Sequence, residues 1–337
     1  DLRRATLTRR TRLRDPQGRA VSITERRFVS LESSHLLAQE TTYVAEFAGT
    51  IEVLSALDGT VENRGVARYN SLDTDHLVHA RSEQVADDTV LLEVRTNDSE
   101  ISIAEAARTR VWRNDEPVEP ERTTDTTDRW AAQTLRLDVE PGDEVRVEKI
   151  VAIFCSRDTG IYSPPEAAAR TVVGAEGFEE LLAAHATAWK HAWNRSRITL
   201  TGDIGHTARI LNLHIFHLLG TVSKNTVDLD VGVPARGLHG EAYRGHIFWD
   251  ELYIFPFLTL RVPELTRSLL RYRSRRLGAA RDAARAEGFA GAMYPWQSGS
   301  DGREETQVVH LNPKSGRWLP DASHLQRHVN AAIVFNI

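Results

Sequence analysis

The run Glu144-Val145-Arg146-Val147-Glu148-Lys149-Ile150, with the pair Pro164-Pro165 that follows it, marks a change in the character of the chain. Apolar and charged side chains alternate through the run, which is the period of a strand with one buried face. The same alternation occurs in Thr50–Leu54 and Val90–Val94. Short strands at about ten-residue spacing, without helical periods between them, predict an antiparallel β-sandwich over residues 1–163.

After Pro164-Pro165 the apolar residues recur every three or four positions, which is the period of a helix. We predict one helix over Glu166–Asn194, within a helical linker of residues 164–200. The helix that begins near Gly205 is apolar almost all round, which predicts burial among other helices. The remaining predicted helices are Leu252–Leu260 (broken at Pro256), Pro263–Ala286 and Ala322–Ile337. Residues 201–337 are therefore predicted to be all-α.

Composition excludes several classes of protein. The chain has 42 Lys and Arg against 47 Asp and Glu, a formal net charge of -5, so it lacks the basic surface of a nucleic-acid-binding protein. We find no signal-peptide core and no apolar stretch long enough for a membrane span, and we expect a cytoplasmic protein. Asp1 lies in mid-pattern and Ile337 in an uncapped periodic run, so we expect a fragment, with the sandwich incomplete at its start and the helical part truncated at its end.

The densest group of chemically useful side chains lies in Pro234–Glu251, where glycines, histidines, arginines, carboxylates and aromatic rings gather in one loop. Trp249-Asp250 suits a sugar, because an aromatic ring covers the apolar face of a pyranose while a carboxylate accepts hydrogen bonds from its hydroxyls. The same dipeptide also fits a capped helix start, with Trp249 in the core and Asp250 as the cap. Both interpretations stay open on these residues alone.

A second cluster of the same kind is Gly291–Glu305, centred on Trp296. Both clusters contain carboxylates, and a general acid could be any of them. The candidates are Glu241, Asp250, Glu251, Glu304 and Glu305. The sequence pattern does not show which of these carboxylates is the general acid.

Two histidine pairs, His214/His217 and His324/His328, have spacings that could place two imidazoles on one helix face. Neither pair has the glutamate of a zinc-protease motif, and the first pair lies in a strongly apolar helix. We predict no metal site and expect buried, hydrogen-bonded histidines instead.

The segment Arg236–Glu251 resembles the signature of the disaccharide phosphorylases of glycoside hydrolase family 65, which act on maltose, kojibiose, nigerose and trehalose. Weaker similarity reaches upstream to the N-terminal residues, so the resemblance covers nearly the whole chain. The other segments that carry it are Leu7–Arg10, Phe216–Leu219, Leu269–Arg273, Leu277–Arg281 and Gly291–Trp296. The segment Leu311–Asp321 departs from the maltose-enzyme type and resembles an actinobacterial, hence bacterial, branch of the family.

The resemblance implies an N-terminal β-sandwich, a helical linker and, in residues 201–337, the first part of an (α/α)6 catalytic barrel with a glucosyl pocket in its mouth. It implies inverting phosphorolysis, in which an α-linked glucose disaccharide and inorganic phosphate give β-glucose 1-phosphate and a released sugar. Phosphate is the nucleophile and a co-substrate, so no cofactor and no second catalytic carboxylate are needed. The expected partners are the disaccharide and phosphate, and the resemblance also admits a homodimer.

Site residues follow from the same resemblance. Trp249 and Asp250 would bind the donor glucose, with Arg236 in the same substrate-binding set, while Trp296 and Gln297 would line the pocket toward the acceptor sugar. Gln297 stands where kojibiose-type members have a glutamate, which leaves the acceptor undefined.

Family members carry their general acid in a Gly-Pro-Asp-Glu-Tyr-His-like loop, and this sequence has no such loop. We therefore expect the catalytic Glu beyond Ile337, no catalytic residue within this chain, and no activity from the chain alone. Glu241, Glu251, Glu304 and Glu305 then become pocket or supporting groups.

Two other functions remain open. A family 65 hydrolase that cleaves trehalose with water would share the same pocket, and so would a noncatalytic carbohydrate-binding piece.

Overall fold

The computed structural model describes residues 1–66, 73–202, 206–236 and 242–337. The chain divides into two compact units, the first made of residues 1–62 and 75–191 and the second of residues 63–74 and 192–337. The domain limits that we expect at residues 163 and 200 stay predictions. Among the described residues, no helix has both the length and the apolarity to span a membrane.

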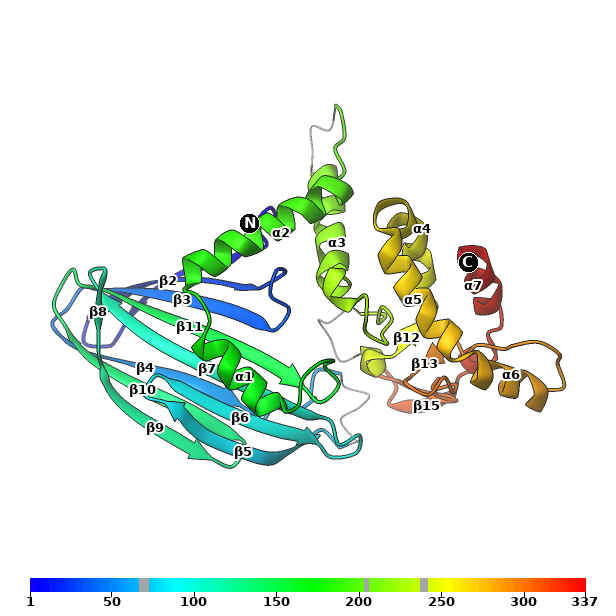
Figure 1. The fold of residues 1–337 in the computed structure, drawn as a ribbon, viewed down its shortest axis with the longest axis horizontal. Coiled ribbons are helices and arrows are strands. Elements are labelled where there is room, and N and C mark those ends of the chain that lie inside the picture. Colours follow the sequence, from blue (N-terminus) through cyan, green and yellow to red (C-terminus); the bar gives the residue numbers. More distant parts are fainter. Residues whose placement is uncertain (67–72, 203–205, 237–241) are drawn as a thin grey trace. The chain divides into compact units, whose positions relative to one another are not determined.

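Antiparallel strands build most of the first unit (Figure 1). Their bounds are β1 Leu7–Arg14, β2 Ala20–Val29, β3 Leu36–Ala45, β4 Gly49–Asp58, β5 Leu77–Ala86, β6 Thr89–Thr96, β7 Ser102–Arg113, β8 Glu116–Val118, β9 Glu121–Thr127, β10 Trp130–Val139 and β11 Glu144–Cys155. The strands predicted at Thr50–Leu54, Val90–Val94 and Glu144–Ile150 are confirmed as parts of β4, β6 and β11.

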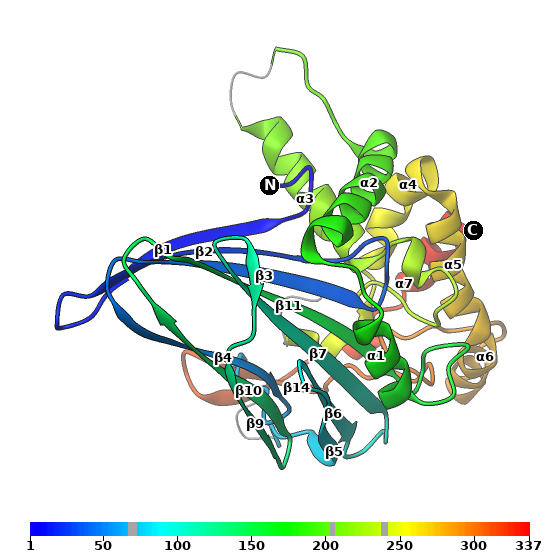
Figure 2. The same ribbon diagram turned by 60° about the vertical axis from the view of Figure 1, so that its left-hand side comes forward.

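These strands form two sheets that pack face to face, and Figure 2 shows them as separate layers. The larger sheet has the order β1-β2-β3-β11-β7-β6-β5, with β8 beside β7, and the smaller sheet has the order β4-β10-β9. One apolar cluster joins Val111 and Val147 of the larger sheet to Leu135 and Leu137 of the smaller. A second cluster joins Leu57, on β4, to residues of β6, β7 and β11. Buried apolar faces on both sheets make this unit a sandwich.

The centre of the larger sheet is covered on both faces. Helix α1 (Pro164–Val173) packs across β7, β11 and β6 (Figure 1), where Ala168 and Val172 meet Ala104 and Ile150. The alternating pattern predicts strands buried on one face, whereas β6 is buried along most of its length. The prediction fails there because a helix lies on the face that alternation would leave to water.

The helix predicted over Glu166–Asn194 is two helices, α1 and α2 (Phe178–Ser196), with residues 174–177 between them. Arg108, on β7 and 2% exposed, donates to the carbonyl oxygens that end α1. Its Nη1 lies 3.0 Å from the oxygen of Val172, 3.2 Å from that of Val173 and 2.7 Å from that of Ala175, and its Nη2 lies 3.1 Å from that of Glu176. A cation is favourable at this end of a helix because the unpaired carbonyls carry partial negative charge.

The start of α2 is held by the opposite charge. Glu148, a buried residue on β11, accepts a hydrogen bond of 2.6 Å from the backbone nitrogen of Phe178. Arg108 and Glu148 lie 3.7 Å apart. One buried ion pair therefore ends α1 and begins α2, which explains why the helical period is interrupted.

We predict that Arg108→Ala lowers the free energy of unfolding by about 3–5 kcal/mol, because Glu148 is left buried without its cation. The matched control is Arg110→Ala on the same strand, whose surface ion pair with Asp88 at 2.8 Å should be worth at most about 1 kcal/mol. Urea unfolding followed by circular dichroism measures both losses. Equal losses would contradict the role given to the buried pair.

His185, on α2, is fully buried at 0% exposure and packs against Phe28 with ring centroids 4.6 Å apart. The backbone nitrogen of Leu31 donates to its Nδ1 at 3.1 Å, so Nδ1 carries no proton. Burial lowers the pKa of His185, although backbone contacts near Ala5 and Arg4 oppose the shift. The folded state therefore favours the neutral form of the His185 imidazole.

A lowered pKa in the folded state gives a defined dependence on pH. The stability contributed by neutral His185 is complete above the unfolded pKa of about 6.5 and is lost as the pH falls from there toward the folded value. We expect the protection of the Leu31 amide against hydrogen exchange, corrected for the intrinsic rate, to fall over that window. In His185→Asn, which keeps an acceptor but does not titrate, this fall should vanish; an identical fall would show that another group is responsible.

The second unit consists of helices and short strands. Its helices are α3 Thr207–Thr221, α4 Glu251–Arg261, α5 Pro263–Arg275, α6 Leu277–Ala286 and α7 Val329–Asn336, with short 3-10 turns at Lys224–Thr226, Ala242–Gly245 and Ser323–Leu325. Its strands are β12 Ile247–Phe248, β13 Gln297–Ser298, β14 Val309–Asn312 and β15 Arg317–Pro320. The expectation of an all-α second half is wrong, because loop residues pair as the ladders β12-β13 and β14-β15. The core joins α4, α5 and α7 through Phe255, Leu258, Leu265, Leu269, Val329 and Ile333.

Helix α4 continues through Pro256, so the predicted break there is wrong. A proline inside a helix leaves the carbonyl four residues earlier without its usual donor. That carbonyl belongs to Leu252, and the side-chain nitrogen of Asn336 on α7 donates to it at 3.3 Å. The tertiary contact replaces the bond that proline removes.

Three other predicted helices differ from the structure. The helix over Pro263–Ala286 is divided at Arg276 into α5 and α6, and only part of Ala322–Ile337 is helical, as α7. Helix α3 is not buried all round: Ile215 and Leu219 are buried, whereas Ile210 is 51% exposed. An apolar helix is buried only where neighbours reach it, and the described residues cover one stripe of α3.

Candidate functional site

One cavity of the second unit, of about 530 Å³, is lined by all five of the site residues proposed from the sequence. These are Arg236, Trp249, Asp250, Trp296 and Gln297. The cavity therefore joins the two clusters, which are some 45 positions apart in the sequence by their numbering. The roles of these residues toward a ligand stay predictions.

Strand pairing holds the two clusters together. Phe248 pairs with Gln297 and Ile247 with Ser298 in the antiparallel ladder of β12 and β13. Because Trp249 follows β12 and Trp296 precedes β13, the pairing brings both tryptophans to the same end of the ladder.

Trp249 and Trp296 together form an aromatic wall of the cavity. The rings of Trp249 and Trp296 stack with centroids 5.2 Å apart and an interplanar angle of 24°. Tyr253 meets Trp249 edge-on at 5.0 Å, and His328 meets Trp296 edge-on at 5.1 Å. Edge contacts of this kind hold the two indoles in place.

Asp250 occupies the N-cap position of α4, but its side chain makes no capping hydrogen bond. Asp250 lines the cavity, and the group that favours its charged form is its own backbone nitrogen. Partial burial raises the pKa of Asp250. The capping bond of the alternative interpretation is therefore absent, whereas its other half holds in part, because Trp249 packs against the apolar core of α4, α5 and α7.

The neighbouring carboxylate has a different environment. Glu251 is 1% exposed, and its Oε1 accepts hydrogen bonds from Nε and Nη2 of Arg273, which is 2% exposed, at 3.0 and 2.7 Å. Its Oε2 accepts from the backbone nitrogen of Val233 at 3.1 Å. Burial raises the pKa of Glu251, and the Arg273 guanidinium opposes the rise. The ion pair anchors the start of α4 to α5 and to the segment before the cavity loop.

Gly232 leaves the space that this arrangement needs. A Cβ atom at this position would lie 2.7 Å from Oε2 of Glu251 and 2.6 Å from Cδ1 of Ile247. Any larger residue at position 232 would require the Glu251 or the Ile247 side chain to shift.

A second glutamate fixes the other cluster. The carboxylate of Glu304 accepts from the backbone nitrogens of Trp296, at 2.7 Å, and Gln297, at 3.1 Å. It also accepts from the nitrogen and hydroxyl of Thr306, at 3.1 and 2.6 Å. Glu305 donates its backbone nitrogen to the Gln297 carbonyl at 3.0 Å. Glu251 and Glu304 thus hold the backbone, while Glu241 lies outside the described residues.

Tyr272 on α5 and Arg276, at the C-cap of α5, complete this support. The hydroxyl of Tyr272 bonds the Ser298 hydroxyl at 2.7 Å and the carbonyl of Gly299. The Arg276 guanidinium lies 3.6 Å from the Tyr272 ring centroid and donates to the Ser300 carbonyl at 2.6 Å. These contacts join the end of β13 to the helix that carries Arg273.

Several residues of the cavity were missed by the sequence reasoning. Tyr243 and Arg244 lie inside the first cluster and have left-handed backbone angles, with φ of 62° and 52°. His310 lies on β14 and Asp321 directly follows β15, and the two side chains lie 3.7 Å apart. The usable signals were the position of Tyr243-Arg244 inside the densest cluster and the turn at Gly316, whose φ is 65°.

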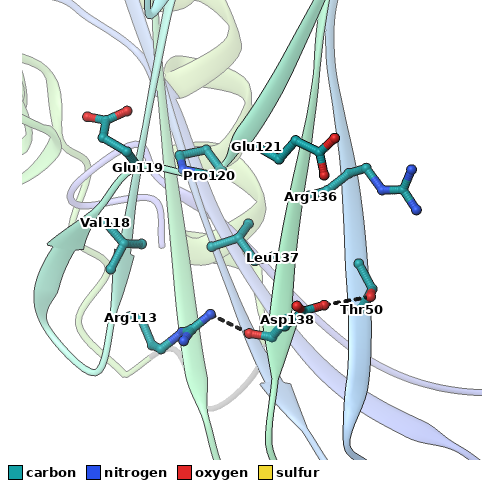
Figure 3. Close-up of a pocket in the computed structure, with 9 residues that line it drawn as sticks. All are labelled: Thr50, Arg113, Val118, Glu119, Pro120, Glu121, Arg136, Leu137 and Asp138. Atoms are coloured by element: carbon teal, nitrogen blue, oxygen red, sulfur yellow. Dashed lines mark hydrogen bonds between the residues drawn. The ribbon is translucent and has the colours of Figure 1, made fainter.

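The sandwich has a cavity of its own, of about 780 Å³ (Figure 3). Two hydrogen bonds join residues of its lining: the Thr50 hydroxyl donates to the Asp138 carboxylate at 2.8 Å, and Arg113 donates to the Asp138 carbonyl. None of the five proposed site residues lies there.

The described residues contain no group of His, Cys, Asp or Glu arranged to hold a metal ion. His214, His217 and His328 are exposed and His324 is half-buried, so the expectation of buried histidines at these positions is wrong. Helix α3 turns His214 and His217 outward because only its opposite stripe packs.

Comparison with known proteins agrees with this geometry. Residues 1–192 match the N-terminal domain of glycosyl hydrolase family 65, and residues 212–337 match the central catalytic domain of the same family. The chain belongs to glycosyl hydrolase family 65. The family membership expected from the sequence is confirmed.

Three relatives place the chain within family 65. An uncharacterized glycosyl hydrolase of Mycobacterium tuberculosis (strain CDC 1551 / Oshkosh) is 46% identical over 338 residues, covering 100% of this chain and 25% of that protein. The trehalose 6-phosphate phosphorylase of Lactococcus lactis is 32% identical over 295 residues, covering 87% of this chain and 37% of that protein. The kojibiose phosphorylase of Caldanaerobacter subterraneus is 32% identical over 349 residues, covering 100% and 44%. The chain thus spans less than half the length of these family 65 relatives.

A solved structure from the human microbiome, provisionally named a kojibiose phosphorylase, superposes with a TM-score of 0.76 at 18% identity, covering 91% of this chain and 39% of that one. At this identity the likeness shows the fold alone.

Adjacent carboxylates give a matched stability test. We expect Glu251→Ala to lower the free energy of unfolding by about 3–5 kcal/mol, because Arg273 is left buried without its anion. Asp250→Ala should cost at most about 1 kcal/mol, the worth of a charge near an exposed helix start. Thermal or urea unfolding of both variants measures the two losses. A loss of unfolding free energy for Asp250→Ala well above about 1 kcal/mol would show that Asp250 caps the helix.

Proposed function

We propose that the cavity is the glucosyl pocket of an inverting phosphorylase that acts on an α-linked glucose disaccharide. The observation that carries this proposal is the meeting of the Trp249–Trp296 wall with the Asp250 carboxylate, which makes no capping bond. Such a site offers an apolar surface for a pyranose ring and acceptors for its hydroxyls. The phosphorylase relatives support the reaction type.

In the proposed reaction Trp249 covers the donor glucose and Asp250 accepts hydrogen bonds from two of its hydroxyls, which orients the scissile bond. Trp296 and Gln297 lie toward the leaving sugar, and Arg236 belongs to the same pocket. Phosphate attacks the anomeric carbon from the face opposite the leaving oxygen, the glycosidic bond breaks, and a glutamic acid gives its proton to the leaving oxygen. The products are β-glucose 1-phosphate and a free sugar.

We place that general acid and the phosphate site outside these 337 residues. Glu251 and Glu304 do not line the cavity, and each accepts a hydrogen bond from the backbone, Glu251 from Val233 and Glu304 from Trp296. On this proposal the chain alone turns over no substrate, and helices α3 to α7 are the first part of an (α/α)6 barrel. The likeness to the solved structure supports that architecture.

The test uses the full-length protein with kojibiose, maltose, nigerose, trehalose and trehalose 6-phosphate, each with and without inorganic phosphate. We predict phosphate-dependent release of β-glucose 1-phosphate from one of them. Glucose release that is independent of phosphate would instead identify a hydrolase. Binding without any turnover would identify a noncatalytic sugar-binding protein.

Asp250→Asn should lower kcat/KM by at least about 100-fold, since charged hydrogen bonds to a substrate are worth about 1.5–3 kcal/mol each. The matched control is Asp301→Asn, a carboxylate in the second cluster that pairs with Arg303 and does not line the cavity. That variant should retain wild-type kinetics. Normal activity of Asp250→Asn would remove Asp250 from the pocket.

A further inference from the structure

We propose that His246 is a positioning residue that determines which end of the Gln297 amide faces the cavity, and thereby which acceptor sugars are used. The inference rests on the proposed function, because it takes Gln297 to meet the acceptor sugar. Neither the sequence clusters nor the aromatic wall assigns a role to His246.

The contact between the two side chains is short. Nε2 of Gln297 lies 2.6 Å from Nδ1 of His246. The amide nitrogen has only hydrogens to offer, so Nδ1 must accept and can carry no proton. The other end of the amide is Oε1, to which none of the described residues donates. Gln297 lines the cavity, and in this state it presents an acceptor to a sugar hydroxyl.

The backbone of Gln297 cannot adjust instead. Its nitrogen donates to Glu304 at 3.1 Å, its carbonyl accepts from Glu305 at 3.0 Å, and it pairs with Phe248 in the ladder. The residue is 6% exposed. The side chain can respond at a small cost in free energy by a half-turn of its amide, which exchanges the oxygen and the nitrogen at nearly constant shape.

Protonation of His246 would require that half-turn. An Nδ1–H group needs an acceptor, so the amide oxygen would turn toward the imidazole and the NH2 group toward the cavity. A site that accepts hydrogen bonds from the sugar would become one that donates them. Acceptor sugars that differ in a single hydroxyl would then change their relative rates.

The surroundings of His246 favour its neutral form. Among the described residues, the charged groups that face it are Arg244, on the turn before β12, and Glu305, in the loop after β13. Burial lowers the pKa of His246 and Arg244 lowers it further, while Glu305 and a backbone hydrogen bond to Tyr243 oppose the shift. At neutral pH the acceptor state of Gln297 is therefore the resting state, and acidification populates the donor state.

The kinetic test uses the full-length protein in the synthetic direction, with β-glucose 1-phosphate and a panel of glucose and its monodeoxy analogues as acceptors. His246→Phe keeps the ring but removes Nδ1, and it should change the ratio of rates between acceptors by about tenfold or more, equivalent to about 1.4 kcal/mol. The KM for β-glucose 1-phosphate should stay within about twofold of wild type, a change worth under about 0.5 kcal/mol. His246→Asn, which restores an acceptor near Nδ1, should restore the ratios. His79→Phe, on the surface of the sandwich, is the control and should leave them unchanged.

The pH profile adds a readout that a merely structural role would not move. Wild-type acceptor ratios should change as the pH is lowered below about 6.5, the ordinary histidine value, while those of His246→Phe stay flat. Unchanged ratios in His246→Phe with phosphorolysis intact would overturn the inference and leave the proposed function standing. A wild type without phosphate-dependent turnover would contradict the proposed function and the acceptor role with it.

A spectroscopic measurement tests the geometry without activity. Two-bond proton–nitrogen correlation spectra of the ¹⁵N-labelled protein at neutral pH should show His246 neutral, with its proton on Nε2. A proton on Nδ1 would overturn the inference whatever the kinetics.

Discussion

The buried ion pair of Glu251 and Arg273 is the constraint on which the candidate site depends. Two charged groups that are almost fully buried are tolerable only if their hydrogen bonds are supplied, and Glu251 receives two from Arg273 and one from Val233. Glu251 directly follows Trp249-Asp250 in the chain. Once Glu251 is fixed in the core, the two preceding side chains have few directions left, and they line the cavity.

The same division between supporting and exposed groups occurs in the second cluster. Glu304 holds the backbone of Trp296 and Gln297, whose side chains line the cavity. Neighbouring carboxylates thus have different roles. Glu251 is buried and paired with Arg273, whereas Asp250 lines the cavity and remains open to a ligand. The sandwich uses a related device, in which Arg108 and Glu148 bond the end of one helix and the start of the next.

The sequence predicts those features that depend on local pattern. Alternation locates β4, β6 and β11, and motif resemblance finds five residues that share one cavity. Prediction from the sequence fails where a residue far away in the chain determines the local structure. The break before α2 depends on Arg108, which is 65 positions before the end of α1 at Val173 by their numbering, and the continuity of α4 through Pro256 depends on Asn336. His310 escapes notice for the same reason, since only the hairpin brings it to the cavity.

A crystal structure of the full-length protein with a bound α-linked glucose disaccharide tests the central claim most directly. The account predicts the glucose ring against Trp249, with two hydroxyls within hydrogen-bond distance of Asp250. It also predicts that Glu251 remains paired with Arg273 and does not touch the sugar. A disaccharide bound elsewhere, or one bonded to a Glu251 that has left Arg273, would contradict it.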